Sequence, residues 1–221
     1  MRSPDTNPSL PWDGRPERAD LIIMGGIVVS GLYGLILLPL VPSLVGTHPA
    51  LLEMLRGSMP SIVTMGALAR TGHAALAVAL LAGIPALIAF DWAYWWAGRR
   101  WGSRGMQMFA GSHRKAVRRG ERVQRLMSRF GPAAVVLAYV LPVPTVLVDA
   151  AAGWGGMRLG VFILCDVIGA LLWASLLVGL GYALGQHAVD VAHAISHYSL
   201  ILTLALVVVI VVRQTMVRRA R

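Results

Sequence analysis

The sequence predicts an all-α polytopic membrane protein with about four spanning helices plus two re-entrant hairpins in an inverted repeat. Of its 221 residues, 57% are hydrophobic and only 14% are charged. The mean hydropathy of +0.67 lies far above that of a soluble globular domain. Several windows reach about 20 apolar residues, the length that crosses the hydrocarbon core of a bilayer. Two further apolar segments are interrupted by proline and glycine, and these are the predicted hairpins.

The chain begins with a polar stretch that leads into the first apolar run. Residues 1–20 hold several prolines and nearly balanced charges, which favours a flexible polar arm. The run Leu21–Val45 is too long for a cleaved signal peptide, and no small-residue cleavage site ends it. We therefore expect it to be the first spanning helix. The membrane domain then covers 21–213, followed by a basic tail at 214–221.

A short interrupted segment follows at Leu51–Ala69. Glu53 and Arg56 are three residues apart, so they can pair on one face of a helix. Gly57-Ser58 and Pro60-Ser61 then break the helix. The segment is too short to span, and we expect a re-entrant hairpin. The alternative is a helix that lies flat on the membrane surface.

The second full span is expected at Ala74–Gly98. It contains Pro85, and Asp91 lies about two turns inside its end. Aromatic side chains gather at that end, as they do where helices leave a bilayer. This predicted aromatic belt consists of Trp92, Tyr94, Trp95, Trp96 and Trp101.

The loop at 99–129 carries ten of the twenty Lys and Arg residues of the chain against one acid, Glu121. Apolar residues recur among its bases, which favours a basic amphipathic helix at Ser112–Phe130 that binds anionic lipid of the inner leaflet. Nucleic acid or a calmodulin-like protein is the alternative partner. A basic cytoplasmic loop is usual in membrane proteins, so we expect membrane lipids as partners and no nucleic acid.

The segment Phe130–Met157 is apolar and long enough to enter a membrane, but Pro142 and Pro144 lie near its middle. Asp149 follows them, and Gly153 lies near the end of the segment. Two half-helices that meet at a break fit this pattern better than a kinked spanning helix, which is the alternative. Transporters hold their substrates at such breaks.

A third span is expected at Leu159–Leu184, with Asp166 inside it, and a fourth at Tyr198–Val212. The polar link between them holds His193 and His197, which can share one helical face. Two histidines without a third ligand are weak evidence for metal. We therefore expect no metal and no cofactor.

The basic residues predict the orientation of the chain. With the N-terminus inside and both hairpins returning to the side from which they entered, eighteen of the twenty Lys and Arg residues lie inside. Only Arg56 and Arg70 lie outside, as the positive-inside rule requires. We expect a multi-pass protein of the plasma membrane with cytoplasmic termini. The two hairpins then face each other, as in an inverted repeat.

Several motifs within about 51–185 resemble those of the DedA family, also called the VTT-domain or SNARE-associated family. The segment FDWAYWWAGRRWG (90–102) is similar to the family's segment with aspartate, tyrosine, glycine and arginine. Later residues fall at the family's spacing, and GLGYALG (179–185) is similar to its closing motif. The matching positions are Asp91, Tyr94, Gly98, Arg99, Pro142, Gly153, Met157, Phe162, Gly169 and Trp173.

The resemblance implies two inward-facing re-entrant hairpins and transport of lipid-linked anions. Bacterial members are linked to undecaprenyl phosphate recycling driven by a proton gradient, and more distant relatives are lipid scramblases. This chain departs from the family in its charges. Ile62 follows the first hairpin's Pro60-Ser61 where the family has glutamate nearby, and Tyr139 and Thr145 stand where it has two arginines. Arginine suits phosphate because its planar fork binds two oxygens.

Three aspartates lie in apolar segments, where an ionised carboxylate is costly, and such residues are functional candidates. The alternative is an aspartate that is protonated or caps a helix. The predicted substrate or proton-relay residues are Asp91, Asp149, Asp166, Tyr139, Thr145, Tyr94 and Arg99. The predicted hairpin breaks are Pro60, Pro142, Pro144 and Gly153.

These residues favour a transporter or flippase for an amphipathic, lipid-linked anionic substrate such as a polyprenyl phosphate, coupled to protons. The alternative is a membrane assembly or partner protein that kept the fold and lost the site. The sequence has no Ser-His-Asp order, zinc spacing or phosphate loop, so we expect no enzyme. The sequence does not determine the oligomeric state, and a homo-oligomer is compatible with it.

The predicted topology can be tested by thiol labelling. After replacement of Cys165, cysteines introduced as Ser112→Cys and Gln214→Cys should be shielded from an impermeant reagent in intact cells. Gln186→Cys should react, because the polar link is predicted outside. Labelling of position 112 from outside would overturn the orientation.

Overall fold

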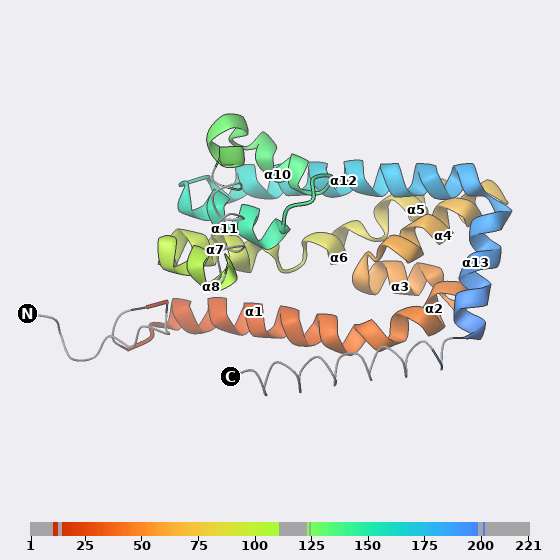
Figure 1. Cartoon of the computed structure of the whole chain (residues 1–221), viewed down its shortest axis with the longest axis horizontal. Coiled ribbons are helices and arrows are strands. Elements are labelled where there is room, and N and C mark those ends of the chain that lie inside the picture. The colour runs from red at the N-terminus through yellow and green to blue at the C-terminus, as the bar shows by residue number, and fades with distance from the viewer. Residues whose placement is uncertain (1–10, 13–14, 111–122, 124, 199–200, 202–221) are drawn as a thin grey trace, which may run out of the picture. The chain divides into compact units, whose positions relative to one another are not determined.

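The computed structural model describes residues 11–12, 15–110, 123, 125–198 and 201, and every regular element among them is helical (Figure 1). The predicted all-α architecture is confirmed. The elements are α1 (Arg18–Leu37), η1 (Leu38–Leu40), α2 (Val41–Thr47), α3 (Pro49–Arg56), α4 (Met59–Arg70), α5 (Leu76–Leu81), α6 (Ile84–Ile88), α7 (Asp91–Trp101), α8 (Ser103–Ala110), α10 (Ala133–Ala138), α11 (Thr145–Trp154), α12 (Leu159–Leu184) and α13 (Gln186–His197).

Three helical runs in the described part of the chain are long and apolar enough to cross a membrane. They are Arg18–Thr47, Leu76–Trp101 and Leu159–Leu184, with mean hydropathy of 2.4, 2.0 and 2.4. These runs match the first three predicted spans. The predicted fourth span, most of the basic surface helix and the basic tail lie outside the described residues.

The second span is confirmed in extent, and the structure adds two interruptions to it. Turns at 82–83 and 89–90 divide it into α5, α6 and α7. Pro85 has no amide proton to donate to a carbonyl one turn earlier, which weakens the helix there. Asp91 is therefore the first residue of α7, not an interior residue of an unbroken helix.

The first predicted hairpin is a helix–break–helix segment made of α3 and α4. Gly57 ends α3 with φ 57°, a left-handed conformation that glycine adopts without strain, and Ser58 is extended. Pro60 lies in the first turn of α4, where no amide proton is needed. The prediction that Pro60 breaks the helix is therefore wrong, and the break lies at Gly57-Ser58.

The second predicted hairpin consists of α10 and α11. Pro142 lies in the connection between them, and Pro144 is the extended residue directly before α11. Both prolines are at the break, as predicted. Gly153 is not, because it lies inside the last turn of α11.

The described residues form two compact units, which we describe separately. Unit 1 comprises residues 1–31 and 88–173, and unit 2 comprises 32–87 and 174–221. In unit 1, α11 packs on α7 (Figure 1). In unit 2, α4 packs on the C-terminal part of α12.

Both helix pairs are held at very short range by two glycines. In unit 1, a Cβ atom at Gly98 would collide with the carbonyl oxygen of Ala150, and one at Gly153 would collide with that of Trp95. In unit 2 the corresponding collisions join Gly66 to Val178 and Gly181 to Val63. In every helix the glycine comes three residues after the colliding carbonyl. Small residues let helices approach this closely.

The ends of the two pairs also correspond. Gly102 follows α7 with φ 55°, and Gly185 follows α12 with φ 54°. Trp154, the last residue of α11, lies against Gly102, and Arg70, the last residue of α4, lies against Gly185. The repeat predicted from hydropathy thus has a counterpart in packing, and the opposite orientation of its halves stays a prediction.

The close approach in unit 2 can be tested with two glycines of α12. Gly181→Ala should destabilise the protein by about 1–3 kcal/mol, because the new methyl group forces α4 away. Gly179→Ala is the matched control, since nothing lies within 4 Å of a Cβ atom at that position. Thermal unfolding of the detergent-purified variants compares them, and equal stability would contradict the close packing.

Candidate functional site

The core of unit 1 surrounds the candidate site with apolar side chains. Val148, Leu147 and Phe162 are each at most 2% exposed and belong to one hydrophobic cluster that also includes Val135. Trp95 stacks on Phe162 with 6.2 Å between ring centroids. A polar group in such surroundings is costly unless it is hydrogen-bonded.

Asp149 lies in the middle of this cluster. It is only 3% exposed, and its neighbours in α11 are the buried Val148 and Ala150. In the described structure its Oδ2 atom has no hydrogen-bond partner. Burial of a carboxylate oxygen without a hydrogen-bond partner makes the ionised form costly in such a place.

Asp166 is equally buried, at 3% exposed, but it has a partner. The hydroxyl of Tyr139 donates a hydrogen bond of 2.8 Å to its Oδ1 atom. Gly169, one turn further along α12, makes room for the tyrosine, because a Cβ atom there would lie 2.6 Å from Cδ2 of Tyr139. Tyr139, which stands where the family has an arginine, is therefore part of the carboxylate site.

Asp91 completes the group from the start of α7. It interacts electrostatically with Asp149 and Asp166, and all three carboxylates act on Tyr139. The structure thus brings together four of the seven predicted site residues, from α7, the end of α10, α11 and α12. The close packing of α7 on α11 is what places Asp91 near Asp149.

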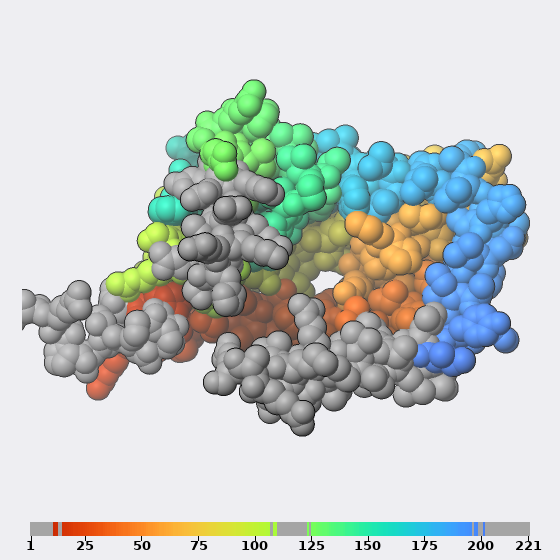
Figure 2. Space-filling model, viewed as in Figure 1, coloured from red at the N-terminus to blue at the C-terminus, as the bar shows by residue number. Residues whose placement is uncertain are grey.

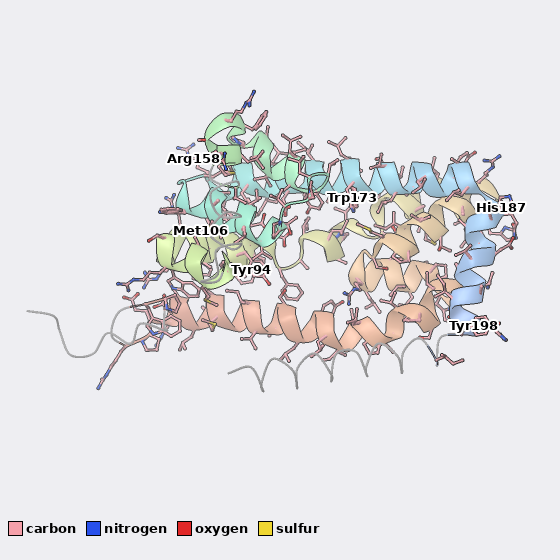
Figure 3. The ribbon with its side chains drawn as sticks, viewed as in Figure 1. Tyr94, Met106, Arg158, Trp173, His187 and Tyr198 are labelled. Atoms are coloured by element: carbon pink, nitrogen blue, oxygen red, sulfur yellow. The ribbon has the colours of Figure 1, made fainter. Side chains whose placement is uncertain are left out.

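The other three predicted site residues lie apart from this group. The hydroxyls of Tyr94 and Ser30 form a hydrogen bond of 3.1 Å, which ties α7 to α1 (Figure 3). Arg99 lies near the C-terminal end of α11. Its Nη1 atom is 3.4 Å from the position that a Cβ atom would occupy at Gly156. Thr145 is the first residue of α11. Among the described residues, no hydrogen bond joins these three to the carboxylates.

Two buried acids were not predicted as site residues. Asp20 was expected in the flexible arm, but it lies in α1, is 2% exposed and accepts hydrogen bonds from Arg100 at 3.0 Å and Trp101 at 2.9 Å. Trp101 is 7% exposed, and Trp95 is partly buried against the hydrophobic cluster of unit 1, so these two side chains pack within the protein, and the aromatic belt stays a prediction. An acid next to a long apolar run is the signal that could have found Asp20.

The second of these acids is Glu53, and its predicted pairing with Arg56 is wrong. Arg56 donates instead a hydrogen bond of 2.7 Å to the carbonyl of Gly34. Glu53 has no exposed surface. It lies within the apolar sequence LLEML, which is the signal that could have marked it.

The histidines of the polar link lie on α13, whose two ends are marked by His187 and Tyr198 in Figure 3. An open groove of about 630 Å³ in unit 2 is lined by Thr47, His193, Ala194, His197 and Tyr198. Figure 2 shows α13 on the surface beside α2. No group of three or more His, Cys, Asp or Glu side chains in the described part of the chain is placed to hold a metal ion.

Long apolar helices, helix breaks and carboxylates buried in apolar packing define a polytopic α-helical membrane protein with an acidic interior site. The VTT domain matches residues 57–183, more than half of the chain, and this range contains Asp91, Asp149 and Asp166. The chain therefore belongs to the VTT-domain family, also called the DedA family. No curated protein and no solved structure matches it.

The pairing of Tyr139 with Asp166 leads to a stability prediction. Tyr139→Phe should cost about 1–3 kcal/mol, because it leaves a buried carboxyl group without its donor. Asp166→Asn should cost much less, since the amide oxygen still accepts the bond. Thermal unfolding of the purified variants measures both. A larger loss for Asp166→Asn than for Tyr139→Phe would mean that the tyrosine does not hold this carboxyl group.

Proposed function

We propose that this protein is a proton-coupled transporter or flippase for an amphipathic, lipid-linked anion such as a polyprenyl phosphate. The observation that carries the proposal is the group of three interacting carboxylates of unit 1, of which Asp149 and Asp166 are buried and Asp91 is half-buried. Acids inside a membrane domain are rare and mark ion or substrate paths. Membership of the VTT-domain family supports the same class of function.

The carboxylates act in this proposal by changing charge. Asp149 lacks a partner on Oδ2, and two further carboxylates nearby disfavour its ionisation by like-charge repulsion. When one of the three carboxylates takes up a proton, its negative charge is lost, and ionisation of the other two becomes less costly. Tyr139 selects among these states, because its hydroxyl stabilises a charged Asp166. A change of helix packing that lets water reach the group would release the proton.

The substrate class rests on different residues. Phosphate recognition by the family's two arginines is not available here, since Tyr139 and Thr145 occupy those positions. The cations of the chain are concentrated at 99–129, and we propose that they hold anionic lipid at the inner leaflet, with both termini cytoplasmic in the plasma membrane. We propose that the chain carries out no covalent chemistry.

A second candidate is an assembly or partner protein that does not transport. The observation that favours it is the loss of the family's glutamate and arginines at Ile62, Tyr139 and Thr145. Purified protein in liposomes with a fluorescent polyprenyl phosphate or phospholipid separates the two functions. Lipid movement that depends on a pH gradient supports transport, and no movement of any lipid with or without a gradient supports the second candidate.

Asp91→Asn tests the proton relay most directly. It keeps the size and much of the hydrogen bonding of the side chain but fixes its charge at zero. We expect gradient-driven lipid movement to fall to the level of protein-free liposomes, with Asp149→Asn losing less.

Asp166→Asn should also lose less than Asp91→Asn, because the family resemblance places an asparagine at that position. Expression and thermal stability are measured alongside. Full activity of Asp91→Asn would end the relay proposal, and unfolding of that variant would show that Asp91 is a structural residue.

A further inference from the structure

Arg56 is a cation at an unusual depth in unit 2. It is the last residue of α3, and its guanidinium donates a hydrogen bond of 2.7 Å to the carbonyl of Gly34 in α1. Gly34 lies near the middle of the 30-residue run Arg18–Thr47, about 20 Å from either end at 1.5 Å per residue. The guanidinium is therefore too deep in the first span for the side chain to reach the membrane surface.

No acid in the described part of unit 2 is paired with this cation. The acids of that part are Glu53 and Asp190. Neither carboxyl oxygen of Glu53 has a hydrogen-bond partner, and its Oε1 lies 3.3 Å from the position of a Cβ atom at Gly83, in the break between α5 and α6. Asp190 is exposed on α13 and accepts a hydrogen bond of 3.1 Å from Gln186. Arg56 thus needs a negative partner from elsewhere.

The guanidinium keeps donors and space for such a partner. An arginine has five N–H donors, and the carbonyl of Gly34 is the acceptor that the described residues provide for Arg56. The side chain is half-buried, and a Cβ atom at Gly34 would meet no described atom within 4 Å. Contact between a guanidinium and lipid tails is costly. An anion that enters this space would remove that cost.

The position of the guanidinium is fixed before any ligand binds. Beside its bond to Gly34, the hydroxyl of Tyr33 donates to the carbonyl of Leu55, so two neighbouring residues of α1 hold the last two of α3. Gly57 then turns the chain away into α4 with φ 57°. A preorganised donor loses little entropy on binding, and the planar fork of arginine fits two oxygens of one phosphate.

We propose that Arg56 binds the phosphate group of an amphipathic lipid, with two of its N–H groups donating to two phosphate oxygens. The hydrocarbon chain of that lipid lies along α1, where large apolar side chains next to Gly34 are more than half exposed. They are Leu32, Leu35 and Ile36. This exposed apolar surface is why the ligand is a lipid phosphate rather than a free one.

Arg56 lies outside the stretch 57–183 that matches the VTT domain, so family membership gives it no role. It supplies in unit 2 the cation that unit 1 lacks at positions 139 and 145. The choice of a lipid as the carrier of the phosphate rests on the proposed function. The binding itself does not require that the lipid moves across the membrane.

Equilibrium binding to the detergent-purified protein tests the site with three probes. Farnesyl phosphate has a short polyprenyl chain and one phosphate group. Farnesol lacks the phosphate, and inorganic phosphate lacks the chain. We expect farnesyl phosphate to bind more tightly than either. Equal binding of farnesol would show that the phosphate is not recognised, and equal binding of inorganic phosphate would show that the ligand is not a lipid.

Two substitutions then assign the binding to one arginine. Arg56→Gln should weaken farnesyl phosphate binding about 10- to 100-fold, because a charged hydrogen-bonding partner is lost, and should leave farnesol binding unchanged. Arg70→Gln is the matched control and should bind like the wild type. Arg70 also donates to backbone carbonyls, at 2.9 and 3.1 Å, but from the exposed end of α4. An equal loss for both ligands in Arg56→Gln would show that Arg56 only supports the fold.

Photocrosslinking of the unchanged protein does not depend on the folding of a variant. A farnesyl phosphate analogue with a diazirine beside the phosphate should label peptides that contain Gly34 or Arg56, and unlabelled farnesyl phosphate should prevent this. Labelling confined to the basic loop 99–129 would overturn the proposal. Binding without lipid movement in liposomes would contradict the proposed function alone, whereas unchanged binding in Arg56→Gln would contradict this inference alone.

Discussion

The close approach of helix backbones at glycine is the constraint on which the rest of each unit depends. Half-helices such as α4 and α11 are too short to be stable alone, and in lipid they gain little from the hydrophobic effect. Contact at Gly98 and Gly153 in unit 1, and at Gly66 and Gly181 in unit 2, supplies van der Waals packing that larger residues would prevent. The breaks are therefore held by their neighbours rather than by their own sequence.

The buried carboxylates follow from this packing. Asp149 is on α11 and Asp91 begins α7, so the glycine contact between these two helices also brings the two acids into electrostatic interaction. Glu53 is placed in a similar way by the glycines at two breaks of unit 2. Among the described residues, each unit thus combines helix breaks with a buried acid that has an oxygen without a hydrogen-bond partner, Oδ2 of Asp149 in unit 1 and both carboxyl oxygens of Glu53 in unit 2. Buried acids of this kind lower the free energy of unfolding. Ionisable residues inside a membrane domain are therefore functional candidates.

The loss of the family's arginines has a structural consequence as well as a functional one. Tyr139 stands at one of these positions, and it donates a hydrogen bond to Asp166 instead of offering a cation to a phosphate. The interior of unit 1 is consequently acidic rather than mixed in charge. Under the proposed function, this favours proton binding over direct phosphate binding within unit 1.

The sequence alone determined that the chain is an α-helical membrane protein, where three of its spans lie and which family it resembles, because hydropathy and motif spacing are local properties. It also selected Asp91, Asp149 and Asp166, since acids in apolar runs stand out without a structure. Only the tertiary structure decided that Glu53 and Arg56 do not pair, that Tyr94 and Arg99 lie apart from the carboxylates, and that Gly153 is a packing residue. Helical spacing shows which side chains can meet, but a carbonyl of another helix, such as that of Gly34 for Arg56, competes for the same donor. That competition depends on contacts between residues far apart in the chain, which no local pattern contains.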